Sequence, residues 1–146
     1  MNILLKRATT KDVKAILALE KVANAKTYSA RINEEEIRDC LKNEFLFLIK
    51  KREVIVGIVV YKVIRKNTVN INGLVIDPKF KGRGFARQAT LLTLKKVRKY
   101  PRIELMVHPH NVPALSLYLS LGFIIESWQN NHFGDGEPRL VMVKKI

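Results

Sequence analysis

Residues 74–87 read LVIDPKFKGRGFAR, and they show how this chain is organised. The apolar start predicts a strand that ends at Pro78, because proline has no backbone N–H for a strand ladder. Gly82 and Gly84 follow, and glycine lets the backbone approach a ligand closely. A helix is expected next, and the start of a helix offers free N–H groups and partial positive charge. The turn therefore predicts a cradle for a pyrophosphate, with three cations around it: Lys81, Arg83 and Arg87.

Two other phosphate-binding motifs fit the chain less well. The sequence contains no Gly-x-x-x-x-Gly-Lys-Ser/Thr, which argues against a P-loop. The dinucleotide fingerprint needs a third glycine and follows the first strand of its fold, whereas this turn lies past the middle of the chain.

Residue patterns place further elements on both sides of the turn. We expect helices capped by Thr9 and Asn33, helices at 83–99 and 111–121, and strands at 3–7, 45–49, 54–64, 68–76, 103–107, 124–129 and 139–143. The order is β-α-α-β-β-β-α-β-α-β-β. An antiparallel meander that leads into a βαβ crossover predicts an α/β (α+β) fold with a mixed sheet. The length predicts one domain over residues 1–146.

Two single residues carry structural expectations. Gly57 lies inside the strand expected at 54–64, where glycine marks a bulge or a close approach of another backbone. Cys40 lies on the inner stripe of the helix that follows Asn33, so we interpret it as a small core residue and not as a nucleophile.

The charge is strongly positive. Lys and Arg number 27 against 13 Asp and Glu, a net charge of +14, which suits acidic ligands such as nucleic acid or a phosphorylated cofactor. The basic residues are spread along the chain, and their densest cluster, residues 95–102, is best explained as the solvated end of a helix. The sequence shows neither a recognition-helix signature nor an aromatic stacking platform, so no specific nucleic-acid binding is expected.

Other features bear on metals and location. One cysteine excludes an intrachain disulfide framework, and three histidines without further cysteines make a poor metal-ligand set, so no metal is expected. The longest apolar run, residues 54–61, is shorter than a membrane span, and the first residues do not resemble a signal peptide. These features predict a cytoplasmic protein without membrane contact, as a monomer or a homodimer.

A second motif supports the first. Residues 111–123 read NVPALSLYLSLGF, which resembles the Asn-x-x-Ala-x-x-x-Tyr-x-x-x-Gly-Phe block of the GNAT family of N-acetyltransferases. Residues 81–86, KGRGFA, resemble the family's acetyl-CoA-binding motif, Gln/Arg-x-x-Gly-x-Gly/Ala, with Lys81 in the place of Gln or Arg. The resemblance covers nearly the whole chain. It implies a seven-stranded, mostly antiparallel sheet flanked by four helices, and direct transfer of an acetyl group from acetyl-CoA to a primary amine.

The resemblance also implies a role for each matched residue. The strand before the glycine turn would pair with the pantetheine arm, the turn would hold the pyrophosphate, and Asn111 would contact the pantetheine region. Tyr118 would be the general acid that protonates the departing thiolate, although its position alone would fit a core aromatic. The implied cofactor-binding residues are Leu74, Val75, Ile76, Lys81, Gly82, Arg83, Gly84, Phe85, Ala86, Arg87 and Asn111.

The general base is less clear in the sequence. Many relatives that acetylate protein N-termini carry Glu five residues before the motif's Asn, where this chain has Met106. Glu104 and His108 lie two residues to either side of Met106 and, by strand alternation, on the same face. Either could be the base, or water could take the proton. Met106 also leaves open a domain that binds acetyl-CoA without turnover.

A late loop points to the acceptor. Residues 131–137, NHFGDGE, resemble the Asn-Tyr-Tyr-x-Asp-Gly-Glu loop of protein N-terminal acetyltransferases, including the ribosomal-protein type, with His132 and Phe133 in place of two substrate-binding tyrosines. The Asp-Gly pair also fits an ordinary hairpin turn. A protein N-terminus is therefore one expected acceptor. The alternative is a small amine such as a polyamine, which the positive charge disfavours unless residues 34–36, EEE, make the site locally acidic.

Overall fold

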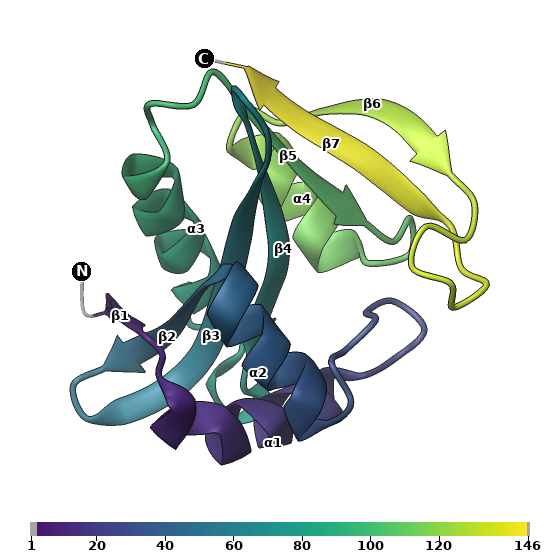
Figure 1. The fold of residues 1–146 in the computed structure, drawn as a ribbon. Coiled ribbons are helices and arrows are strands. Elements are labelled where there is room, and N and C mark those ends of the chain that lie inside the picture. The colour runs from purple at the N-terminus through teal and green to yellow at the C-terminus, as the bar shows by residue number, and fades with distance from the viewer. Residues whose placement is uncertain (1–2, 146) are drawn as a thin grey trace.

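The structure is a computed structural model that describes residues 3–145 as one seven-stranded sheet with helices on both faces (Figure 1). The strands are β1 (Leu4–Arg7), β2 (Phe45–Lys51), β3 (Val54–Arg65), β4 (Thr68–Ile76), β5 (Arg102–Val107), β6 (Ile124–Gln129) and β7 (Arg139–Lys145). The helices are α1 (Val13–Ala23), α2 (Glu34–Asn43), α3 (Phe85–Lys96) and α4 (Val112–Ser120). Short 3-10 turns occupy Thr10–Asp12 and Pro78–Phe80.

The strand order confirms the expected mixed sheet. The strands lie in the order β1-β2-β3-β4-β5-β7-β6, and β4 with β5 is the one parallel pair among the described residues. Helix α3 makes the crossover between these two strands, as a parallel connection requires. The meander β1–β4 thus lies on one side of the β4–β5 pair, and β7 with β6 lies on the other (Figure 1).

Each face of the sheet has its own apolar core. Helices α1 and α2 cover one face, and this core includes Val13, Ile16, Ile37, Cys40, Leu46, Leu48, Ile58 and Val60. Helices α3 and α4 contribute to the core on the opposite face, with Phe47, Val59, Phe85, Ala89, Ile103 and Tyr118. Cys40 is 1% exposed, so its interpretation as a core residue is confirmed.

The local start signals of the first two helices are confirmed. The Asp12 carboxylate accepts a hydrogen bond from the Thr9 N–H at 2.8 Å, as in a capping box, and the Asn33 side chain accepts one from the Glu36 N–H at 2.9 Å. The helix expected at 83–99 is shorter and spans Phe85–Lys96. It starts late because Gly84 has a left-handed backbone with φ +80°, which a helix cannot include.

Gly57 combines both features expected of a glycine within a strand. A Cβ atom there would lie 2.1 Å from the carbonyl oxygen of Val75 on β4. The register between β2 and β3 shifts beside it, between Ile49 and Lys50. This glycine therefore lets β3 and β4 come close at the end of β4 that precedes the glycine-rich turn. No helix within residues 3–145 has the length and apolar character needed to cross a membrane.

Candidate active site

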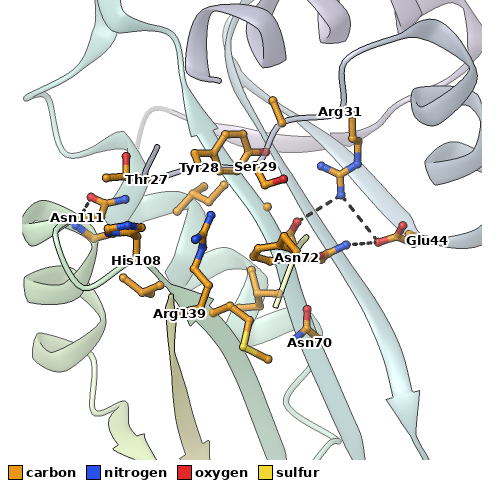
Figure 2. A pocket seen from close by; sticks show the side chains of 18 of the residues that line it. Thr27, Tyr28, Ser29, Arg31, Glu44, Asn70, Asn72, His108, Asn111 and Arg139 are labelled. Carbon is orange, nitrogen blue, oxygen red and sulfur yellow. Dashed lines mark hydrogen bonds and ion pairs between the residues drawn. The ribbon is translucent and has the colours of Figure 1, made fainter. Parts of the chain in front are cut away.

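The central pair of strands separates and opens a cleft. Strands β4 and β5 pair only from Thr68–Arg102 to Ile71–Leu105. Beyond that point β4 stays paired with β3 as far as Ile76, and β5 stays paired with β7 as far as Val107. A pocket of about 360 Å³ lies where the two strands diverge (Figure 2). Beyond Ile71 β4 has no strand partner on its β5 side among the described residues, so backbone N–H groups on this edge are available to a ligand, whereas the Asn72 carbonyl accepts a hydrogen bond from Arg31.

Residues from five parts of the chain line this pocket, which we call the cleft. The contributing segments are the end of β4, the end of β5 with α4, the α1–α2 connection, α2 with Glu44 after it, and the loop before β7 with the first residue of β7. Leu105 and Val107 belong to the core on the α3–α4 face, so the alternating residues Met106 and His108 face the α1–α2 side. The cleft therefore reaches from one face of the sheet to the other.

The glycine turn has the backbone that a phosphate cradle needs. Gly82 and Gly84 have φ angles of +77° and +80°, and no atom lies within 4 Å of where a Gly82 Cβ would stand. Gly84 caps α3 without a side-chain hydrogen bond, so the N–H groups at the helix start stay available to an anion. These features fit a bound pyrophosphate.

The side chains around the turn have different surroundings. Lys81 and Arg83 are exposed, and the Arg83 guanidinium lies over the Phe80 ring, 5.5 Å from its centroid. Arg87 donates a hydrogen bond to the Ser120 hydroxyl at 2.9 Å, which ties α3 to α4. Phe85 is buried and Ala86 is half-buried. The turn thus presents mainly backbone and two exposed cations to solvent.

The strand residues expected to hold the pantetheine arm are placed differently from one another. Leu74 lines the cleft. Val75 is buried in the core under α1 and α2, and Ile76 packs on the core of the opposite face. Any contact of Val75 or Ile76 with a molecule in the cleft would therefore go through the backbone.

Asn111 lies at the start of α4, in the wall of the cleft. Its side-chain oxygen accepts a hydrogen bond from the Ala114 N–H at 3.3 Å, as an N-cap does, and the same side chain lines the cleft.

Tyr118 lines the cleft from α4 and is 6% exposed. Its ring packs edge-on against Phe123 with centroids 5.5 Å apart. Burial raises the pKa of its hydroxyl, and no charged group within residues 3–145 offsets this effect. The hydroxyl therefore keeps its proton at neutral pH, as a general acid must.

Glu104 lies outside the cleft, in the part of β5 that is still paired with β4. Its carboxylate oxygen Oε2 lies 2.9 Å from the Arg65 guanidinium and 3.2 Å from Nε of Arg102. Both guanidinium groups thus bind the same carboxylate oxygen. This arrangement favours a structural role for Glu104.

His108 lines the cleft and is 1% exposed. Its Nδ1 accepts the backbone N–H of His110 at 3.0 Å, so in the neutral ring Nε2 carries the proton and donates it to Glu137 at 2.8 Å. Both ring nitrogens are then engaged, and neither offers a free lone pair to an amine. In this geometry His108 holds the loop before β7 in place through Glu137.

The two loop residues expected to bind substrate are separated by the structure. Phe133 lines the cleft. His132 is exposed outside it, and its Nδ1 lies 2.6 Å from the side-chain oxygen of Gln129. The aromatic wall expected from this loop therefore consists of Phe133.

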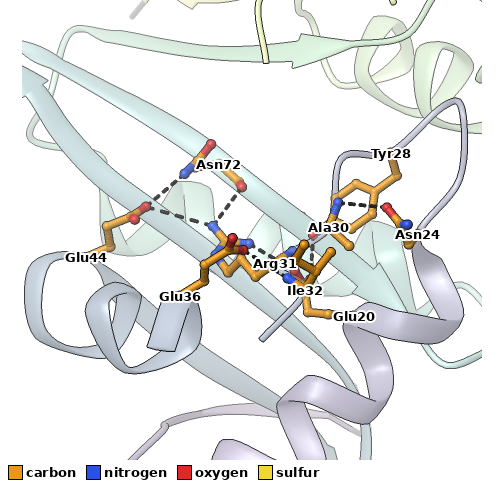
Figure 3. Close-up of polar contacts among 9 residues, drawn as sticks. All are labelled: Glu20, Asn24, Tyr28, Ala30, Arg31, Ile32, Glu36, Glu44 and Asn72. Carbon is orange, nitrogen blue, oxygen red and sulfur yellow. Dashed lines mark hydrogen bonds and ion pairs between the residues drawn. The ribbon is translucent and has the colours of Figure 1, made fainter. Parts of the chain in front are cut away.

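A buried polar network in the α1–α2 connection escaped the sequence analysis (Figure 3). The Tyr28 hydroxyl donates to Glu20 at 2.6 Å, and the Arg31 N–H donates to the same carboxylate at 2.6 Å. Burial and the Glu20 charge raise the pKa of Tyr28. Arg31 also donates to the Asn72 carbonyl at 3.3 Å, so the network fixes this connection against β4 beside the cleft. Residues 24–32 carry no regular pattern that could have revealed it.

Arg139 was also missed as a cleft residue. It begins β7, is 1% exposed and lines the cleft. Its place in an alternating strand marked it as inward-facing, but an inward arginine is not expected in a core. Within residues 3–145, no three His, Cys, Asp or Glu side chains gather in a way that could hold a metal ion.

Comparisons with known proteins place the chain in a family. The model of the acetyltransferase (GNAT) family matches residues 10–123, so the chain belongs to the GNAT family of acetyltransferases. Mycothiol acetyltransferase from Acidothermus cellulolyticus is 42% identical over 52 residues, which cover 34% of this chain and 16% of that protein. The match thus spans about a sixth of that relative's length.

Solved structures share the fold over nearly all of both chains. Ard1 from Thermoplasma volcanium is similar with a TM-score of 0.88 and 17% identity, covering 100% of this chain and 99% of that one. The ribosomal-protein-S18-alanine N-acetyltransferase from Escherichia coli has a TM-score of 0.82 and 17% identity, covering 99% and 94%. A variant of spermidine N-acetyltransferase from Vibrio cholerae has a TM-score of 0.82 and 21% identity, covering 99% of this chain and 94% of that one. At these identities the likeness shows the fold alone, and the expected GNAT-like fold is confirmed.

Proposed function

We propose that the protein transfers an acetyl group from acetyl-CoA to a primary amine, and that the amine is the α-amine of a protein N-terminus. The observation that carries the proposal is the divergence of β4 and β5 beside an uncapped helix start. The turn and the start of α3 suit the pyrophosphate, and the free edge of β4 suits the extended arm that follows it. The acceptor amine enters from the α1–α2 side of the cleft.

Acetyl-CoA supplies the thioester, and the chain's own groups polarise its carbonyl and supply the proton for the departing sulfur. Free backbone N–H groups on the diverging edge of β4 polarise the thioester carbonyl. The neutral amine forms the new C–N bond, the C–S bond breaks, and Tyr118 gives its proton to the departing sulfur. Because Glu104 is held by two arginines and both nitrogens of His108 are engaged, we propose that water takes the proton from the amine.

The peptide acceptor is supported by the loop before β7. This loop places Phe133 in the wall of the cleft and resembles the loop of protein N-terminal acetyltransferases. A similar structure is named a ribosomal-protein-alanine N-acetyltransferase.

One observation favours a polyamine as the second candidate. Glu36, Asp39 and Glu44 line the cleft, and acidic groups attract polycations. Another similar structure is named a spermidine N-acetyltransferase.

The first experiment is calorimetric titration of acetyl-CoA into the wild type and Gly84→Glu. A Glu side chain at the start of α3 would repel the pyrophosphate, so binding is expected in the wild type and lost in the variant. Gly136→Glu is the matched control, because Gly136 has a similar φ of +79° and open space but lies in the other loop. Absence of binding to the wild type would refute the proposal.

The second experiment measures acetyl transfer to peptides with free N-termini and to spermidine. Faster transfer to peptides is expected. Turnover with spermidine alone would assign the polyamine function instead, and binding without any turnover would identify a non-catalytic acetyl-CoA-binding domain.

A further inference from the structure

Arg139 is an unusual residue to find in this cleft. It is among the largest fully buried side chains of the protein, yet it carries a permanent charge. Burying a charge is costly unless it is paired and hydrogen-bonded. In β7 Met142 belongs to the core on the α3–α4 face, so by strand alternation Arg139 lies on the other face, with Met106 and His108. This is the side from which we propose that the acceptor enters.

The hydrogen bonds of Arg139 within the described residues use only some of its N–H donors. Nη2 donates to Asp135 Oδ2 at 2.8 Å and Nη1 donates to the Pro138 carbonyl at 3.0 Å. A guanidinium has five N–H donors, so among residues 3–145 two are accounted for by these bonds. The guanidinium also lies 5.0 Å from the centroid of the Phe133 ring, so one face of it is covered. In Figure 2 it extends into the cleft between His108 and Asn72.

The acidic residues that line the cleft do not neutralise this charge. Glu44 lies against Arg31 at 4.0 Å and accepts a hydrogen bond from Asn72 at 2.9 Å. Glu36 accepts the backbone N–H of Ile32 at 2.9 Å. Asp39 accepts a hydrogen bond from the Asn43 side-chain amide at 2.8 Å. All three carboxylates thus have partners in or next to α2, and Asp135 is the acid paired with Arg139.

We propose that Arg139 is a specificity-determining residue, which donates a hydrogen bond to a carbonyl oxygen close to the acceptor amine. This inference rests on the proposed function and deepens it. An N-terminal α-amine has its own main-chain carbonyl two bonds away and satisfies the guanidinium. A polyamine offers no oxygen and brings a second ammonium group toward a buried cation, which is unfavourable in a site of low dielectric.

The test compares three acceptors in the wild type and in Arg139→Gln. The acceptors are a peptide with a free N-terminus, the same peptide extended by a 6-aminohexanoyl group, whose amine is far from any carbonyl, and spermidine. In Arg139→Gln, kcat/KM for the free peptide is expected to fall roughly tenfold or more, the scale of one charge-assisted hydrogen bond. The values for the other two acceptors are expected to stay the same or, for spermidine, to rise.

Two further variants separate recognition from structure. Asp135→Asn breaks the ion pair but keeps the guanidinium, so it should keep the preference for the free peptide. Arg139→Lys keeps the charge but loses the planar fork, so it should still reject spermidine while losing part of the peptide preference; this variant carries the test if Arg139→Gln does not fold. Acetyl-CoA titration and thermal unfolding confirm that each variant is folded and loaded.

The outcomes are distinct. An equal fall for all three acceptors in Arg139→Gln, or the same change of preference in Asp135→Asn, would show a structural ion pair and overturn the inference. A wild type that acetylates the free and the extended peptide equally well would also overturn it, while the proposed transferase activity would stand. A wild type that acetylates none of the acceptors would refute the proposed function itself.

Discussion

Tyr118 shows how burial tunes a single side chain in this cleft. Its hydroxyl lies in an apolar setting that raises its pKa, and the ring is held by Phe123 and not by a hydrogen bond from the hydroxyl to a described residue. Replacing the hydroxyl by hydrogen therefore leaves the packing intact. A loss of activity in such a variant reports chemistry and not folding.

Tyr118→Phe is expected to lower kcat by about 10²- to 10⁴-fold, the usual contribution of a general acid. The melting temperature and the affinity for acetyl-CoA should stay close to the wild type. Because the pKa of Tyr118 is raised, its hydroxyl should still be protonated at pH ~10, where an ordinary tyrosine titrates. The wild-type rate should therefore not fall as the pH passes ~10. Steady-state rates from pH 6 to 11 check this. A variant with an unchanged kcat would point to water as the proton donor.

Cys40 is expected to resist alkylation in the folded protein. Burial raises the pKa of its thiol to about 11, so at pH 8 the folded chain holds roughly two hundredfold fewer thiolates than an unfolded one with a pKa near ~8.5. Because the folded pKa is the higher one, the thiol's contribution to stability is present below pH ~8.5 and is lost as the pH rises toward 11. Iodoacetamide labelling with and without urea measures the difference. Equal rates would place the thiol at the surface.

At the scale of elements, β3 and β4 depend on a contact between backbones. The approach at Gly57 occurs after β4 has left β5 and just before the chain enters the glycine turn, so it sets the path of the strand that forms one wall of the cleft. Any side chain at this position would push β4 away.

Gly57→Ala is expected to lower the free energy of unfolding by about 3 kcal/mol, because the new Cβ meets the Val75 carbonyl and the backbone must shift. Affinity for acetyl-CoA should fall with it. Gly134→Ala is the control: its φ is +78° with open space, so it should cost only about 1 kcal/mol of conformational strain. Urea unfolding of both variants makes the comparison. Equal losses would mean that the approach of β4 is not the cause.

At the scale of the whole molecule, the charge of +14 predicts weak attraction to any polyanion. Binding to RNA or DNA of unrelated sequence should be similar, and should fall steeply between 50 and 200 mM salt, as counterion release requires. Filter binding over a salt series measures this. Affinity that differs between sequences, or that persists at high salt, would instead reveal a specific nucleic-acid site.

Features that depend on residues close together in the sequence could be predicted, and features that depend on residues far apart could not. Caps at Thr9 and Asn33 depend on residues three apart, and the glycine turn depends on its own backbone, so both could be predicted. The pairing of Glu104 with Arg65 joins residues 39 apart, and only the assembled sheet reveals it. Arg139 was missed because its burial depends on the loop that folds over it.

The divergence of β4 and β5 also makes a bound molecule part of the protein's architecture. Four residue pairs join the meander of β1–β4 to the β5–β7 half, and beyond them the ladder has no rungs. An extended molecule lying in the gap would supply hydrogen bonds that β4 and β5 do not make with each other there. Acetyl-CoA would then act as an eighth strand shared by both halves. Binding of acetyl-CoA should then raise the melting temperature, and the loaded protein should unfold in one transition. The protein without acetyl-CoA should open locally first, between β4 and β5.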